Sequence, residues 1–173
     1  MQAAKIVTLI ILVIMFVQDI KSRSIAWPLF PALAVLFVII RFAPRWSFSG
    51  MVIEVAGPLI CLSFMLTMVS LYISARYRKW IWITDEMLGW ADVLFLACLA
   101  FYLPLLNYML FFIASSIVIL LSWLVYQLMS PVKSKFIPFA GCQALLLGGL
   151  LVISWLSPFD ITSDLWFIKL ATR

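Results

Sequence analysis

Histidine is absent from this chain of 173 residues, and none of its three cysteines forms a C-x-x-C pair. The lack of histidine excludes Ser-His-Asp and Cys-His catalysis and removes a common ligand of zinc sites. Cys61, Cys98 and Cys142 all stand in apolar runs, so we expect buried thiols and no disulfide framework. Neither a metal nor another cofactor is predicted.

Charged residues are also scarce. They make up 11% of the chain, whereas hydrophobic residues make up 66%, and a typical soluble domain is about a quarter charged. A chain of this length cannot bury so much apolar surface in one core. The composition therefore disfavours a soluble enzyme or a disordered chain and predicts an all-α integral membrane protein.

Six apolar segments predict a six-transmembrane-helix bundle with short loops, which forms a single membrane-embedded domain over residues 1–173. The spans are expected at about residues 3–20, 25–40, 51–73, 88–103, 108–129 and 136–156. Residues 157–173 are expected to form an interfacial tail rather than a seventh span.

The basic residues predict the orientation of this bundle. The net charge is +5, which in a membrane protein reflects topology and contact with anionic lipid, so no nucleic-acid partner is expected. The connections on one side carry Lys21, Arg23, Arg76, Arg78, Lys79, Lys133 and Lys135, and the other side carries Lys5, Arg41, Arg45, Lys169 and Arg173. The positive-inside rule then places both termini outside and the first group in the cytoplasm.

Three acidic residues lie in or beside the apolar segments, and two of them belong to one membrane face. Asp19 ends the first segment and Asp92 lies just inside the start of the fourth. The two segments between them make one return crossing, so both acids lie at the same face in either orientation. Ionisable residues in such positions are costly and often functional. Glu54 begins the third segment near the opposite surface and is interpreted as structural.

Two adjacent carboxylates can hydrolyse a peptide bond as aspartic proteases do. They share one proton, so one carboxylate accepts a proton from the attacking water and the other polarises the scissile carbonyl. In a plainer interpretation, Asp19 is a solvated helix end and Asp92 is an acid favoured by the helix dipole at an N-terminal turn. The residues alone leave both interpretations open.

Three short motifs in register resemble those of the type IV prepilin peptidases. Residues 19–25 (DIKSRSI) resemble the motif D-x-x-x-R-x-I-P, residues 89–93 (GWADV) resemble G-x-G-D-V, and residues 136–141 (FIPFAG) resemble an I-P-F-G segment. Presenilin-type intramembrane aspartic proteases share the second motif in outline. The resemblance covers nearly the whole chain and implies that Asp19 and Asp92 form a catalytic dyad.

The resemblance implies a membrane aspartic endopeptidase of the bacterial cytoplasmic (inner) membrane. Family members remove the short basic leader from type IV prepilins or pseudopilin-like single-span proteins of pili and secretion systems, at the cytoplasmic face. The chain resembles the short, protease-only form, because it starts at the first core helix and has no C-x-x-C pairs. We therefore expect no N-methyltransferase activity and no requirement for S-adenosylmethionine.

Other motif residues are expected to bind the substrate or shape the site, namely Lys21, Arg23, Gly89, Ala91, Pro138 and Gly141. The chain departs from the family pattern at Ala26, where a proline is usual, at Ala91, which replaces the second glycine of G-x-G-D, and at Leu94, where a lysine is frequent. The alternatives are a catalytically inactive relative, or a small membrane transporter or scaffold that uses Asp19 and Asp92 as a polar or proton-relay pair.

Overall fold

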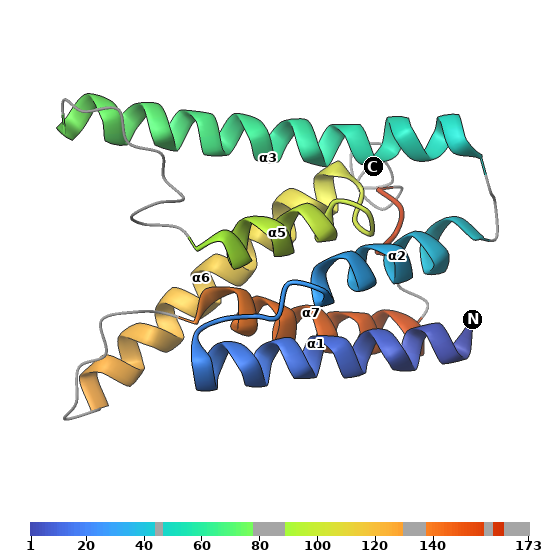
Figure 1. Ribbon diagram of the computed structural model, residues 1–173, viewed down its shortest axis with the longest axis horizontal. Coiled ribbons are helices and arrows are strands. Elements are labelled where there is room, and N and C mark those ends of the chain that lie inside the picture. Colours follow the sequence, from blue (N-terminus) through green and yellow to red (C-terminus); the bar gives the residue numbers. More distant parts are fainter. Residues whose placement is uncertain (44–46, 78–88, 130–137, 158–160, 165–173) are drawn as a thin grey trace, which may run out of the picture.

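The structure is a computed structural model and describes residues 1–43, 47–77, 89–129, 138–157 and 161–164. Within these ranges the chain forms six helices (Figure 1). They are α1 (Gln2–Ser22), α2 (Leu29–Phe42), α3 (Phe48–Tyr77), α5 (Trp90–Leu99), α6 (Leu105–Met129) and α7 (Phe139–Leu156).

Four of these helices, α1, α3, α6 and α7, are long and apolar enough to cross a membrane. The other two are shorter: α2 has 14 residues and α5 has 10, whereas a perpendicular span needs about 20. The all-helical, multi-pass membrane class predicted from composition is therefore present. Of the six expected spans, four correspond to helices that are long enough to cross a membrane, and two correspond to shorter helices.

Prolines explain why several helix ends differ from the expected ones. The second helix begins at Leu29 instead of near residue 25, because Pro28 occupies its N-cap position and proline is favoured at the start of a helix. Likewise, α5 ends at Leu99 and α6 begins directly after Pro104. Pro58 lies inside α3, which continues past it. The expected helix starts at residues 88 and 136 lie outside the described residues.

Three helices, α1, α5 and α6, pack against α7. α1 lies along α7 and also packs against α2, while α5 packs against both α2 and α7, and α3 contacts α6 and α5. Figure 1 shows α3 along the top and α1 along the bottom, with the C-terminal end of α1 and the N-terminal ends of α5 and α7 toward the left. α7 therefore joins the two helices that carry Asp19 and Asp92.

The buried core lies where α1, α2, α5 and α7 meet. Leu12, Phe37, Phe95 and Leu147 come one from each of these helices and are fully or almost fully buried. Thr8 is buried on α1 as well, and its hydroxyl donates to the Ala4 carbonyl oxygen at 2.8 Å. This bond satisfies the hydroxyl within its own helix, which a polar group in an apolar environment requires.

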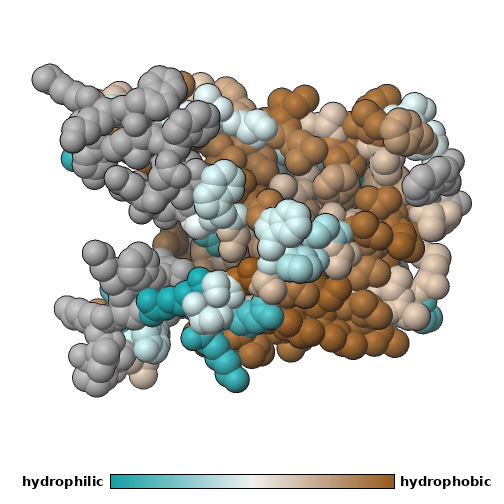
Figure 2. All heavy atoms as spheres, in the orientation of Figure 1, coloured by the Kyte–Doolittle hydropathy of each residue, from teal (hydrophilic) through white to brown (hydrophobic). Residues whose placement is uncertain are grey.

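The outer surface is also apolar. Ile10 on α1, Ile60 on α3 and Leu121 on α6 are among many exposed aliphatic side chains, and Figure 2 shows hydrophobic residues over much of the visible face, including the region of α1. A continuous apolar exterior of this kind is suited to lipid rather than to water.

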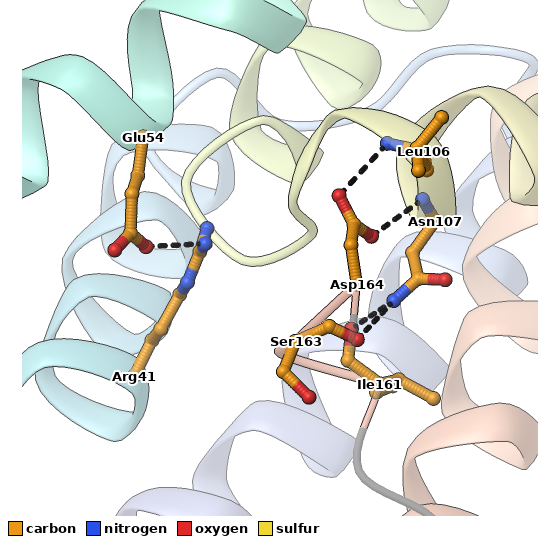
Figure 3. A network of polar contacts seen from close by, with 7 residues as sticks. All are labelled: Arg41, Glu54, Leu106, Asn107, Ile161, Ser163 and Asp164. Atoms are coloured by element: carbon orange, nitrogen blue, oxygen red, sulfur yellow. Dashed lines mark hydrogen bonds and ion pairs between the residues drawn. The ribbon is translucent and has the colours of Figure 1, made fainter. Parts of the chain in front are cut away.

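Polar contacts fasten the end of the molecule opposite Asp19 (Figure 3). Arg41, whose side chain is 4% exposed, forms an ion pair of 2.7 Å with Glu54, so Glu54 has the structural environment that its position predicted. Asp164 accepts hydrogen bonds from the backbone N–H groups of Leu106 and Asn107, each at 3.3 Å. Residues 161–164 of the predicted tail thus pack on the start of α6, and residues 158–160 and 165–173 lie outside the described residues.

Candidate active site

Asp19 is buried in the last turn of α1. Its exposed fraction is 7%, and its Oδ2 atom accepts a hydrogen bond of 2.7 Å from the backbone N–H of Gly141. The helix closes just beyond it, because Arg23 adopts a left-handed conformation (φ 52°) and its N–H donates to the Asp19 carbonyl oxygen at 3.0 Å. The side chain is therefore an enclosed, hydrogen-bonded carboxylate rather than a solvated helix end.

Gly141 approaches Asp19 so closely that no side chain fits between them. A Cβ atom built on Gly141 would lie 2.7 Å from the Asp19 Cβ and 2.9 Å from its Oδ2. A Cβ atom at such short distances would force Asp19 or the backbone of α7 to move. The glycine of the I-P-F-x-G-like segment is thus required by the close approach of α7 to α1.

Asp92 is the third residue of α5 and is half-buried. Its carboxylate interacts with the backbone N–H groups of Gly89 and Ala140. The Gly89 contact is local, because Gly89 is the N-cap of α5 and an acid at the third helical position reaches back to the N-cap amide. Gly89 has an ordinary extended conformation (φ −65°, ψ 141°), so its backbone amide is the part that contacts the acid.

The two carboxylates meet at the first turn of α7. Ala140 contacts Asp92 and the next residue, Gly141, contacts Asp19, and the two acids interact electrostatically with each other. Amides in a first helical turn have no partner within the helix, and the N-terminal end of a helix carries partial positive charge. Pro138 occupies the N-cap of this helix. The I-P-F-x-G-like segment signalled this turn, but sequence reasoning did not identify it as the contact shared by both acids.

A comparison with known families shows the family to which this chain belongs. The family model of the type IV leader peptidases matches residues 6–124, a range that includes both Asp19 and Asp92. The chain belongs to the type IV leader peptidase family. No curated protein and no solved structure matched the chain. Membership confirms the resemblance found in the motifs and assigns the chain to a family of leader peptidase-like proteases. The matched range ends before α7.

Where this chain departs from the family motif at Ala91, the backbone needs no glycine. Ala91 lies in the first turn of α5, and Arg23 is the one non-glycine residue with positive φ in the described part of the chain. The Ala91 side chain is half-buried and packs against the hydrophobic core, as does Leu94 in the following turn. Both departures therefore place apolar groups in apolar surroundings.

The third departure from the family motif, Ala26, forms a hydrogen bond that a proline at this position could not form. Its backbone N–H donates a hydrogen bond of 2.9 Å to Oε1 of Gln18, a bond that a proline could not make because it has no N–H. Gln18 thereby ties the connection after α1 to the helix turn that carries Asp19. Sequence reasoning missed Gln18, because nothing in its local pattern distinguishes it from an ordinary polar residue at a helix end.

The two basic residues of the first motif have different positions. Lys21 is exposed in the last turn of α1. Arg23 is exposed as well and lines a cleft that Asp19 also lines. The structure therefore brings Asp19, Asp92, Gly89, Pro138 and Gly141 to one end of the molecule around the start of α7, with Arg23 beside them.

The cleft next to Asp19 has a volume of about 540 Å³. It is bounded by the end of α1, the C-terminal half of α6 and the N-terminal half of α7, and most of its lining is apolar. Sequence reasoning missed it, since the cleft depends on how α6 crosses α7. Within the described residues, no cluster of three or more His, Cys, Asp or Glu side chains is arranged to hold a metal.

Proposed function

We propose that this protein is an aspartic endopeptidase that removes the basic leader from prepilin- or pseudopilin-like single-span membrane proteins. Asp19 and Asp92 are the catalytic residues of the proposal. The observation that supports it best is the convergence of the two carboxylates on consecutive backbone amides of α7. The family membership supports the peptidase activity, and the motif resemblance supports the aspartic mechanism and the substrate class.

The mechanism follows from two acids that share one proton. The ionised carboxylate accepts a proton from water as the water oxygen bonds to the scissile carbonyl carbon, and the protonated carboxyl donates a hydrogen bond to the carbonyl oxygen. In the next step the C–N bond breaks and the leaving amine receives a proton from the dyad. Because the two groups titrate as a pair, we assign neither the acid nor the base to one residue.

The backbone amides of α7 have a defined part in this mechanism. The Gly141 N–H binds Oδ2 of Asp19, which leaves Oδ1 to bind water or substrate, and the Ala140 N–H interacts with Asp92. Because the carboxylates are already oriented before the substrate binds, the entropic cost of reaching the transition state is lower. The partial positive charge at the start of α7 also offsets the repulsion between two acids held side by side.

The proposal extends to the membrane setting. Both acids lie at the end of the molecule where the last turns of α1 and α3 carry Lys21 and Arg76, and the positive-inside rule assigns such an end to the cytoplasm. We accordingly propose a protein of the bacterial inner membrane with both termini outside, in which α2 and α5 act as shortened spans. Leader removal without N-methylation completes the proposed activity.

The test is leader removal from candidate prepilin-like proteins co-expressed with this chain, read as a mobility shift on a gel. Asp19→Asn and Asp92→Asn should each lower the rate by about 10²–10⁴-fold, the usual contribution of an acid–base group. Glu54→Gln, which changes an acid at the opposite end, should leave cleavage intact. Unchanged cleavage in either folded Asp→Asn variant would rule out the dyad and favour a polar-pair role in transport or scaffolding.

A further inference from the structure

The cleft beside Asp19 opens toward lipid. Val118 and Tyr126 on α6 and Leu145 on α7 line it, and each is about half exposed on the apolar outer surface. Asp19 lines the same cleft. A mostly apolar path therefore leads from the lipid-facing side of α6 and α7 to one of the two carboxylates.

The surroundings of the cleft limit what can occupy it. A polypeptide at membrane depth must satisfy its own backbone hydrogen bonds, so it must be helical there. A helix is about 10 Å wide, and the volume of about 540 Å³ holds the side chains of one helix face rather than a whole helix. The occupant must also present a peptide bond at the Asp19 end of the cleft.

We propose that this cleft is the docking groove for the first turns of the substrate's transmembrane helix, immediately after the scissile bond. The substrate enters sideways from the lipid and lays one helix face between α6 and α7. Trp123 and Tyr126, whose ring centroids are 5.5 Å apart, form an aromatic wall of the groove and determine which side chains fit. This inference rests on the proposed leader peptidase function and identifies the part of the substrate that the enzyme recognises.

The position of Arg23 in the cleft favours one direction of the substrate. Arg23 lines the cleft beside Asp19, and its positive charge disfavours the approach of a basic leader into the groove. The apolar helix therefore occupies the groove, while the leader extends away from it past the carboxylates. A reversed substrate would place basic side chains against Arg23 and against apolar walls.

Cys142 provides a direct probe, because it is a free cysteine that lines the groove. In a Cys61→Ser, Cys98→Ser background, single cysteines are placed along a prepilin-like substrate and oxidised with copper phenanthroline. Cys98→Ser keeps a donor for the Phe30 carbonyl oxygen, which the thiol contacts at 3.2 Å. We expect disulfides at helical spacing just after the scissile bond and none in the leader.

A control moves the probe to an exposed position on another helix, outside the groove. Cys142→Ser combined with Tyr72→Cys on α3 should give no periodic cross-links, since Tyr72 is exposed away from the groove. Cross-links without cleavage would sustain the docking groove and overturn the proposed chemistry. Cleavage without cross-links would overturn the groove and leave the proteolytic function standing. Cross-links in the leader would overturn the proposed direction.

A second test needs no cysteine background. Trp123→Ala should change the ratio of kcat/KM between two substrates that carry a large or a small side chain after the scissile bond, by about tenfold in favour of the large one. Tyr72→Ala should leave the ratio unchanged. A uniform loss for both substrates would overturn the specificity role and assign Trp123 to anchoring at the membrane interface.

Discussion

At the scale of single residues, the position of Asp19 depends on the absence of a side chain at Gly141. The Gly141 N–H lies 2.7 Å from the Asp19 carboxylate, and this approach leaves no room for a methyl group. Gly149, two turns further along α7, has no neighbouring atom within 4 Å of the place where a Cβ would lie. Replacing each glycine by alanine therefore separates two effects: the close contact at Gly141, and the general effect of placing alanine in α7, which Gly149 reports.

Gly141→Ala is expected to displace Asp19 and to lower leader cleavage by about 100-fold, the cost typical of a misplacement of about 1 Å at a catalytic group. Gly149→Ala should leave cleavage unchanged. The measurement is the cleavage rate of each purified, folded variant in lipid, with folding checked by thermal unfolding. Equal activity of the two variants would show that the Gly141 contact does not set the geometry of the site.

At the scale of secondary-structure elements, the site is assembled from helix ends. Asp19 lies in the last turn of α1, Asp92 in the first turn of α5, and the amides that contact them lie in the first turn of α7. Helix ends carry unpaired backbone groups, so three of them can hold two acids without any further polar side chain. Figure 1 shows the first turn of α5 at the same end of the molecule as the other two helix ends.

Ala91→Gly restores the glycine of the family motif and tests whether α5 needs it. Because Ala91 already has an ordinary backbone conformation and packs on the core, we expect cleavage to stay within a few-fold of the native rate. The free energy of unfolding should fall by up to about 1 kcal/mol, the difference in helix propensity between alanine and glycine. A large gain in activity would show instead that the methyl group obstructs the site.

At the scale of the whole molecule, the two ends are stabilised by different means. The end with the carboxylates relies on backbone amides, and the opposite end relies on the Arg41–Glu54 ion pair and on the segment 161–164. That segment also receives hydrogen bonds from the Asn107 side chain at the carbonyl oxygens of Ile161 and Ser163, at 2.9 and 3.1 Å (Figure 3).

Asp164→Ala removes the acceptor for the first amides of α6 and should lower the free energy of unfolding by about 0.5–2 kcal/mol, as loss of a helix cap does. Leader cleavage per folded molecule should remain near the native rate, because the change lies at the far end of the bundle. Thermal unfolding and cleavage assays on the same preparation check both parts. A selective loss of cleavage without loss of stability would reveal coupling between the two ends.

Much of the site could be predicted from the sequence because membrane topology is a strong constraint. The number of crossings between Asp19 and Asp92 fixes them at one face, and the motifs fixed which residues to examine. The contact with Gly141 and the cleft beside Trp123 depend on how helices pack, which hydropathy does not encode. The lengths of α2 and α5 were overestimated because apolar residues continue into turns that Pro28 and Pro104 introduce.

The junction of both acids with one turn of α7 has a consequence for how the protein tolerates change. Consecutive amide nitrogens are separated by covalent bonds, so the distance between the two anchoring points is inherited from the main chain and not from side-chain packing. Substitutions that slightly tilt α1 or α5 should be tolerated in related sequences, provided that the N–H groups of Ala140 and Gly141 still contact the two acids. Sequence variation should accordingly be broad over the lipid-facing surface and narrow at this single turn.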